Sequence, residues 1–550
     1  MKQYDAIIIG SGIGGLAAAL CLAREGKKII IIEQHVVPGG WCHSFYINGQ
    51  RFSPGVHYID NIEEGQSTNK LLKGLGIAND LVFFRMNSNA FEHCWIGEHK
   101  IDLPSKVENW ISVLSEKFPD EKKRIIKYLK LVKNVSDQIQ LIPKMKGFWD
   151  NITIPYRTRH LGKFGLFPLK KVIKWHIKNP LLRQILNIQC GNHGLAAANA
   201  SFPLHCAVMD HYFEGGYYPM GGGAGLVKAF TNKIKQLNGE IKLGSNVEKI
   251  IVEKNENKIK AIGIKLSNGE EIYANAIISN TDPHNTYKMI GTENLSEKLS
   301  KKIAKTKYSV SSLMFFVVVN MDLSNTKIDS GNIWMTNEGE KDSLEQDVFN
   351  ENKFSSLFIS CSSLKDPTSY DGIHHTFEIV TFVNYDSFSD FHNEEKNRSE
   401  SYLKMKQTLC NKLLDTMDLI IPDFKENTVN IELGTPITNQ YYIQGTRGNV
   451  YGTEKGFWQT GPFSFSHKSE IENLFLCGAS IISHGVAGSA YSGVKAASIV
   501  LNKNENEILS YDENQKLRVY DAEDEKKWPE NILNKIKIKR EKTIKLMKQG

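Results

Sequence analysis

The chain has 550 residues, 41% of them hydrophobic and 23% charged, and its formal net charge is +7. This length predicts two folding units, and the composition is that of an ordinary globular protein. No apolar run approaches the roughly 20 residues of a membrane span. No nucleic-acid fold signature accompanies the positive charge, so we expect no nucleic-acid partner.

The N-terminal segment predicts a βαβ unit that binds a nucleotide. Its elements are a short apolar strand (4–9), the turn GSGIGG (10–15), a helix (13–25) and a second strand (28–32). Gly10 allows the tight turn, Gly12 lets the backbone approach a pyrophosphate, and Gly15 lets the helix pack against the strand. Ile13 and Gly14 begin the helix, whose free N–H groups face the phosphates.

Glu33 closes the second strand, where a carboxylate accepts hydrogen bonds from both ribose hydroxyls and repels a 2′-phosphate. Flavoproteins of the glutathione-reductase type share the second glycine pair that follows, whereas NAD dehydrogenases usually continue into another helix. FAD is therefore the expected cofactor. The further candidate contacts in this segment are Gln34, Gly39, Gly40, His43 and Ser44.

Two basic segments carry large apolar side chains. Residues 156–183 contain eight Lys/Arg and no acid, and residues 526–550 contain nine Lys/Arg and two Glu. In the second segment Ile532, Ile536, Ile544 and Met547 recur at helical spacing. Such mixtures suit an anionic membrane surface, and a solvated helix with a floppy tail is the alternative. Because the chain begins with a predicted strand and not with a signal peptide, we expect a cytoplasmic protein. A peripheral position on the inner face of the membrane is the alternative.

A second cofactor fingerprint is predicted near the C-terminus. Residues 474–477 form a strand, Gly478 follows, and a helix begins near 487–489 after a loop. This segment brings a second backbone approach to the pyrophosphate and a helix N-terminus to the flavin. Val486 and Ala487 are its candidate contacts.

The eight cysteines are scattered, and no C-x-x-C pair occurs among them. We therefore expect free, mostly buried thiols. The sixteen histidines show no metal-ligand spacing, so no metal site is predicted.

Three blocks resemble one FAD superfamily, which contains all-trans-retinol saturases, carotenoid cis-trans isomerases and phytoene desaturases. The first block is EQHVVPGGWCHSFYINGQRFSPGVHYI (33–59). The second is CGNHGLAAANASFPLHCAVMDHYFEGGYYPMGGGAGL (190–226), and the third is GTPITNQYYIQGTRGNVYGTE (434–454). The second and third are similar to the saturase branch. One departure is that saturases commonly carry an Asp two residues before the glycine matched by Gly55, where this chain has Ser53.

The resemblance implies an α/β fold: a glutathione-reductase-like FAD-binding Rossmann domain with a discontinuous α+β substrate domain, in an amine-oxidase-like layout. The FAD domain would comprise residues 1–75, 206–299 and 426–505, and the substrate domain 76–205 and 300–425. Residues 506–550 would form a basic tail. In the family, the backbone of the residue that matches Val247 contacts the adenine.

The implied activity is hydride transfer at flavin N5 to or from carbon–carbon bonds of a long apolar polyene or isoprenoid, by saturation or desaturation. A carotenoid isomerase that uses reduced FAD without net redox, an amine-oxidase-like enzyme and a non-catalytic lipid-binding flavoprotein are the alternatives. No nicotinamide site is clear, and the electron donor or acceptor stays open. His57 and His484 are candidates to donate a proton or bind the flavin, and Tyr217 and Tyr218 to line the substrate cavity or pack in a strand.

Overall fold

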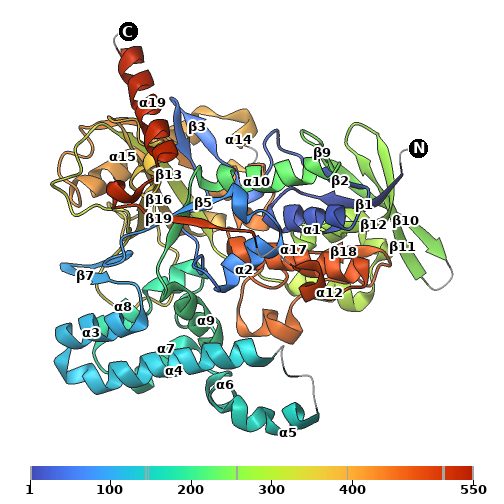
Figure 1. Cartoon of the computed structure of the whole chain (residues 1–550), viewed down its shortest axis with the longest axis horizontal. Coiled ribbons are helices and arrows are strands. Elements are labelled where there is room, and N and C mark those ends of the chain that lie inside the picture. Colours follow the sequence, from blue (N-terminus) through green and yellow to red (C-terminus); the bar gives the residue numbers. More distant parts are fainter. Residues whose placement is uncertain are drawn as a thin grey trace.

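The structure is a computed structural model that describes residues 3–142, 145, 148–255, 258–392, 394–510 and 514–547. It contains two seven-stranded sheets, a layer of helices and a small third sheet (Figure 1). Within the described residues, no helix is both long and apolar enough to cross a bilayer.

The first sheet holds the predicted nucleotide-binding unit. Five parallel strands lie in the order β9-β2-β1-β12-β18, and an antiparallel pair, β10-β11, extends the sheet beside β12. The strands are β1 (Gln3–Ile9), β2 (Ile29–Ile32), β9 (Glu240–Lys242), β10 (Val247–Asn255), β11 (Lys258–Leu266), β12 (Glu271–Ser279) and β18 (Leu474–Leu476). The expected strands at both ends of the chain are confirmed to within two residues.

Both faces of this sheet are covered, so its strands are continuous apolar runs. Ala6 and Ile8 of β1 face a core that includes α1 (Ile13–Arg24), α10 (Gly222–Gln236) and α17 (Gly485–Leu501). Ile7 and Ile9 face the opposite core. A Cβ on Gly493 of α17 would lie 2.0 Å from the carbonyl oxygen of Gly14, so α1 and α17 touch through their backbones.

The second sheet has the order β17-β13-β16-β15-β14-β6-β7. Its strands are β6 (Glu92–Ile96), β7 (His99–Leu103), β13 (Ser311–Val319), β14 (Asn332–Thr336), β15 (Ser356–Cys361), β16 (His375–Val383) and β17 (Thr428–Gly434). Because side chains alternate along a strand, Phe315 and Val317 of β13 pack into a core with α15 (Glu400–Asp418). Met314 and Phe316 face the other way, toward the first domain.

The helical layer lies at the lower left of Figure 1. Its members share one apolar core: α3 (Val107–Lys117), α4 (Lys122–Leu141), α6 (Arg159–Phe164), α7 (Leu169–His176), α8 (Pro180–Leu186), the 3-10 helix η5 (Ile188–Asn192) and α9 (Phe202–Tyr212). Helix α5 (Phe148–Arg157) lies beside α6.

The C-terminal segment is tied to the fold. Strand β19 (Arg518–Asp521) pairs with β5 (Val82–Arg85), which also pairs with β8 (Tyr217–Pro219). The helix predicted from apolar spacing is confirmed as α19 (Glu530–Met547), and it buries Ile532 and Ile536 while Ile544 is exposed. The floppy-tail alternative is wrong for the described part of this segment.

The remaining elements connect these layers. They are α2 (Ser67–Gly74), α11 (Pro283–Ile290), α12 (Glu297–Lys305), α13 (Ser362–Lys365), α14 (Glu394–Asn397), α16 (Pro436–Ile443), α18 (Glu505–Ile508), β3 (Phe45–Ile47) and β4 (Gln50–Phe52).

Two predicted domain boundaries fall in the wrong place. The boundary between 205 and 206 lies inside α9, which belongs to the helical layer. The boundary between 425 and 426 assigns β17 to the FAD domain, whereas β17 pairs with β13 in the second sheet. Both errors concern pairing between distant segments, which local sequence patterns do not report.

Candidate functional site

A cavity of about 770 Å³ lies between the two sheets. The carboxyl ends of β1, β2, β12 and β18 open onto it through Ile9, Ile32, Asn280 and Cys477, which is where parallel α/β sheets bind ligands. Most of the predicted cofactor residues line it: Gly10, Gly12, Ile13, Gly14, Glu33, Gln34, Gly39, Gly40, Val247, Gly478, Val486 and Ala487. The fold thus brings the two terminal fingerprints and the middle segment to one wall.

The glycine turn has the geometry of a pyrophosphate cradle. Gly10 adopts φ +89°, and a Cβ on Gly15 would lie 2.2 Å from the carbonyl oxygen of Gly10. A Cβ on Gly12 would meet only the side chain of Asn280. Gly12 caps α1, whose first turn contains no acidic residue, so the helix presents its N–H groups to the cavity without a competing carboxylate.

Glu33 joins the glycine turn to the segment that follows β2. Its side chain is buried; Oε2 accepts hydrogen bonds from the amide (2.8 Å) and hydroxyl (2.6 Å) of Ser11, and Oε1 accepts one from the amide of His35 (2.8 Å). The carboxylate therefore holds the glycine turn to the end of β2. It fits the ribose of an adenine nucleotide, as the sequence predicts.

Replacing this carboxylate tests the adenosine end of the site. We expect Glu33→Gln to weaken FAD binding by about 10- to 100-fold, since a hydrogen bond to a charged group contributes about 1.5–3 kcal/mol. Titration of the apoprotein with FAD, followed by flavin fluorescence, measures this. Glu395→Gln, at a buried glutamate outside the described cavity lining, is the control, and equal affinities in the two variants would contradict the assignment.

Three of the predicted contacts lie outside the described cavity lining: Gly15, His43 and Ser44. His43 Nδ1 lies 2.7 Å from the carbonyl oxygen of Gly40. The hydroxyl of Ser44 accepts a hydrogen bond from the amide of Ala224 and lies 2.9 Å from the hydroxyl of Ser53. Their direct contact with the cofactor remains a prediction.

The other end of the cavity is apolar. Met314, Trp334, Phe358, Val380 and Phe382, all from the second sheet, line it. Tyr217 and Tyr218 lie away from the described lining and are buried in β8, so they pack in a strand. An elongated apolar molecule fits a cavity with this wall, while the opposite wall holds the nucleotide.

His57 lines the cavity and is fixed by a carboxylate from the second sheet. Its Nδ1 lies 2.9 Å from Oε2 of Glu378, and the amide of Ser53 donates to Oε1 of the same residue (2.7 Å). Glu378 thus orders the loop in which the family's Asp is missing. Sequence reasoning missed it; the available signal is a glutamate inside the apolar strand HTFEIVTFV.

His484 lines the cavity as a neutral ring. Burial lowers its pKa to about 4, with a further contribution from the charge of Lys455. Its Nε2–H donates to the carbonyl oxygen of Asn192 (2.7 Å), and its Nδ1 is buried without a partner in the described part of the chain. The ring therefore has an unprotonated Nδ1, and a role for it as proton donor remains only a prediction.

A tyrosine in the cavity wall is hydrogen-bonded to a buried glutamate. Tyr58 lines the wall, and its hydroxyl lies 2.6 Å from Oε1 of Glu92. The amide of Asn192 donates to the same hydroxyl oxygen (2.7 Å), and Nε1 of Trp334 donates to Oε2 of Glu92 (2.7 Å). Burial raises the pKa of Glu92 to about 7, although its hydrogen-bond donors act in the opposite direction.

Sequence reasoning also missed this pair, because Glu92 lies 34 residues from Tyr58. A glutamate in the apolar strand EHCWI is the only local signal. The Tyr58 hydroxyl donates to an ionised Glu92. A protonated Glu92 can instead donate to the Tyr58 oxygen, as Asn192 does, which leaves the tyrosine hydrogen free for another acceptor.

The predicted thiol state is confirmed, since all eight cysteines are free and buried. Burial raises the pKa of Cys42, beside the second glycine pair, to about 12. This thiol is therefore protonated and unreactive at neutral pH.

The chain is similar to known proteins over most of its length. A family model described as flavin containing amine oxidoreductase matches residues 13–501. All-trans-retinol 13,14-reductase of Danio rerio is 28% identical over 531 residues, covering 92% of this chain and 87% of that protein. Prolycopene isomerase 1, chloroplastic, of an Oncidium hybrid cultivar is 26% identical, covering 90% and 83%.

The similarity extends to solved structures. Putrescine oxidase bound to putrescine has a TM-score of 0.61 at 16% identity, covering 91% of this chain and all of that one. At this identity the match concerns the fold: a nucleotide-binding Rossmann domain and a second, sheet-containing domain. The predicted fold class is confirmed.

Proposed function

The chain belongs to the family of flavin containing amine oxidoreductases and is an FAD-dependent oxidoreductase, and we propose that it saturates a carbon–carbon double bond of a long apolar polyene. The observation that carries the proposal is Tyr58, which lines the cavity beside Phe358 of its apolar end and is hydrogen-bonded to the buried Glu92. Saturation of a double bond needs one hydride and one proton. Desaturation needs no acid of this kind.

The cofactor has a fitting cradle in the glycine turn, Glu33 and Gly478. When bound in its reduced form, FAD would supply the hydride, and with it the electron pair, that the reaction needs. The chain's own residues supply the rest. Met314, Trp334 and Phe358 exclude water and hold the polyene by its apolar surface.

Tyr58 gives its hydroxyl proton to the second carbon of the double bond, and Glu92 returns a proton to Tyr58 in the same step. Burial and the neighbouring Glu92 raise the pKa of Tyr58 well above its ordinary value, so a free tyrosinate is costly. Coupling the two transfers avoids that species, and the net acid is Glu92. Water then protonates Glu92 again, which completes the proton balance.

The similarity to prolycopene isomerase favours the isomerase alternative. Incubation with three polyenes distinguishes it from saturation. The flavin-loaded protein is reduced without oxygen and incubated separately with all-trans-retinol, phytoene and a cis-lycopene. We expect retinol to gain two hydrogens, read by chromatography and mass. A geometric change at constant mass would favour an isomerase, and turnover of amines alone would favour an amine oxidase.

We further propose that residues 156–183 dock on an anionic membrane, from which an apolar substrate enters. Tyr156, Leu166 and Trp175 are exposed here, and Lys171 lies 5.3 Å from the centre of the Trp175 ring. Basic residues beside exposed aromatic and aliphatic side chains suit a lipid headgroup layer. The other basic helix, α19, lies at the top left of Figure 1, away from the helical layer at the lower left that contains this segment.

Exchange of two exposed apolar residues tests this docking. We expect Leu166→Asp with Trp175→Asp to reduce binding to anionic vesicles about 10-fold or more, because each buried apolar side chain contributes about 1.5–3 kcal/mol. Vesicle flotation measures it. Trp458→Asp, at another exposed tryptophan, is the matched control, and loss of binding in the control alone would place the contact elsewhere.

A further inference from the structure

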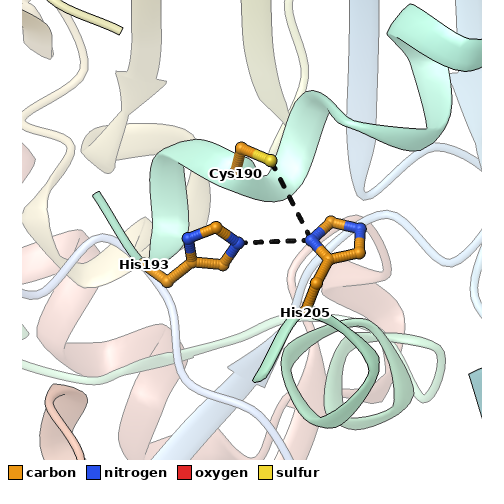
Figure 2. Close-up of side chains that lie close together, drawn as sticks. All are labelled: Cys190, His193 and His205. Atoms are coloured by element: carbon orange, nitrogen blue, oxygen red, sulfur yellow. Dashed lines mark hydrogen bonds between the residues drawn. The ribbon is translucent and has the colours of Figure 1, made fainter. Parts of the chain in front are cut away.

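Three buried side chains outside the proposed reaction point their ligand atoms at one another: Cys190 from η5, His193 from the position directly after η5, and His205 from α9 (Figure 2). Nε2 of His193 lies 3.2 Å from Nδ1 of His205, and Sγ of Cys190 lies 4.0 Å from the same Nδ1. The three ligand atoms lie within 4.8 Å of one another. In the sequence they form a C-x-x-H pair followed by a distant histidine.

The hydrogen bonds around the trio leave lone pairs at its centre. Nε2 of His205 lies 3.1 Å from the carbonyl oxygen of Leu186, to which it donates. This outer bond fixes the tautomer and leaves Nδ1 of His205 unprotonated, as in histidines that bind metals. The ring nitrogen of His193 that faces His205 is Nε2, and it has a lone pair for an ion when the proton of the neutral ring is on Nδ1.

The spacing is close to that of a tetrahedral ion. With Zn–N distances of about 2.0–2.1 Å and Zn–S of about 2.3 Å, tetrahedral angles place two nitrogens about 3.3 Å apart and a nitrogen and sulfur about 3.6 Å apart. The nitrogen pair already has this separation. The sulfur, which lies 4.0 Å from Nδ1 of His205 and within 4.8 Å of Nε2 of His193, needs to move closer to both nitrogens.

We propose that Cys190, His193 and His205 bind a Zn²⁺ ion, with a water molecule as the fourth ligand. Cysteine and histidine are the ligands that this ion prefers, and neither oxidation nor reduction is involved. Binding releases the thiol proton of Cys190 to solvent, and the thiolate offsets one of the two positive charges of the buried ion.

The ion would stabilise the wall that carries Tyr58. Asn192, between Cys190 and His193, donates to the Tyr58 hydroxyl and accepts from His484. The carbonyl oxygen of Gly191 accepts from the Tyr451 hydroxyl (2.9 Å). A metal that joins η5 to α9 therefore holds these contacts from the side opposite the cavity, without touching the substrate.

Metal content of the flavin-loaded, full-length protein tests the site. The protein is purified with a tag that lacks histidine, and its metals are measured by mass spectrometry. We expect about one zinc per chain, and at least a 10-fold lower content in Cys190→Ser and in His205→Gln. Cys206→Ser is the matched control, because Cys206 is a buried neighbour of His205 outside the trio, and it should keep the metal.

Cobalt substitution provides a readout that does not depend on the variants folding. Wild-type protein loaded with Co²⁺ should show the visible bands of a tetrahedral thiolate site, in the red beyond the absorption of oxidised flavin. Folded, flavin-loaded protein that contains no stoichiometric zinc and acquires no such bands overturns the proposal. Zinc retained in both ligand variants, or copper in its place, overturns it as well.

Discussion

Tyr58→Phe is expected to slow transfer of hydrogen from the reduced enzyme to a polyene by about 100- to 1,000-fold, which is the usual contribution of a positioned general acid. The substitution removes the hydroxyl that lies 2.6 Å from Glu92 and keeps the ring that lines the cavity. The rate is measured in a single turnover, from reoxidation of the flavin on mixing with substrate. Reduction of the flavin by dithionite should be unchanged.

Glu92→Gln should have a similar effect and should also change the pH profile. Burial raises the pKa of Glu92 to about 7, so its protonated, donating form is present below pH 7 and is lost as the pH rises. In the wild type the transfer rate should fall about tenfold per unit above pH 7. The glutamine variant should show no such fall.

Neighbouring groups also affect the titration of Glu92, so the pH dependence must be assigned to one residue. Tyr58 and Trp334 donate hydrogen bonds to it, and the charges of Lys365 and His93 lower its pKa against the effect of burial. Burial itself lowers the pKa of Lys365 to about 8, so a limb near pH 8 that survives in Glu92→Gln would belong to that lysine.

A second tyrosine–glutamate pair provides the control for these variants. The Tyr402 hydroxyl donates to Glu395 (3.0 Å), both side chains are buried, and neither belongs to the described cavity lining. Tyr402→Phe and Glu395→Gln therefore remove the same chemical groups outside the described lining. If Tyr58→Phe stays within threefold of these controls, Tyr58 is not the proton donor.

Gly12→Val is expected to weaken FAD binding by at least about 100-fold, or about 2.8 kcal/mol. Gly12 lines the cavity at the start of α1, where its added Cβ would meet only the Asn280 side chain. The fold should therefore survive, while the isopropyl group occupies the space in which the backbone approaches the pyrophosphate.

Gly162→Val is the matched control, because Gly162 lies in α6 and a Cβ there would meet nothing within 4 Å. Flavin content after gel filtration, and titration of the apoprotein with FAD, distinguish the two variants. Thermal unfolding of both apoproteins shows whether Gly12→Val still folds. Stoichiometric flavin in Gly12→Val would exclude the proposed cradle.

The nucleotide-binding half was predictable because its signals are local. Gly10 and Gly15 lie within a few residues of the strand and helix that they join, and Glu33 ends the adjacent strand. The C-terminal fingerprint around Gly478 is equally local, and α17 begins two residues before its predicted start at Ala487.

The groups proposed to act on the substrate were not predictable in the same way. Glu378 reaches Ser53 and His57 from 321 or more residues away, and its own strand gives no reason to place it there. Residues 428–434 were assigned to the wrong domain because only the antiparallel pairing of β17 with β13 places them. The ligand atoms of Cys190 and His205 meet because η5 packs on α9, which the spacing of cysteines and histidines does not indicate.

The most direct test of polyene saturation is an anaerobic titration of the reduced, flavin-loaded protein with all-trans-retinol, followed by the flavin spectrum and product mass together. We expect flavin to be reoxidised in step with the added polyene and each molecule of product to have gained two hydrogens. Flavin that stays reduced while the polyene keeps its mass, with or without a change of geometry, would contradict it.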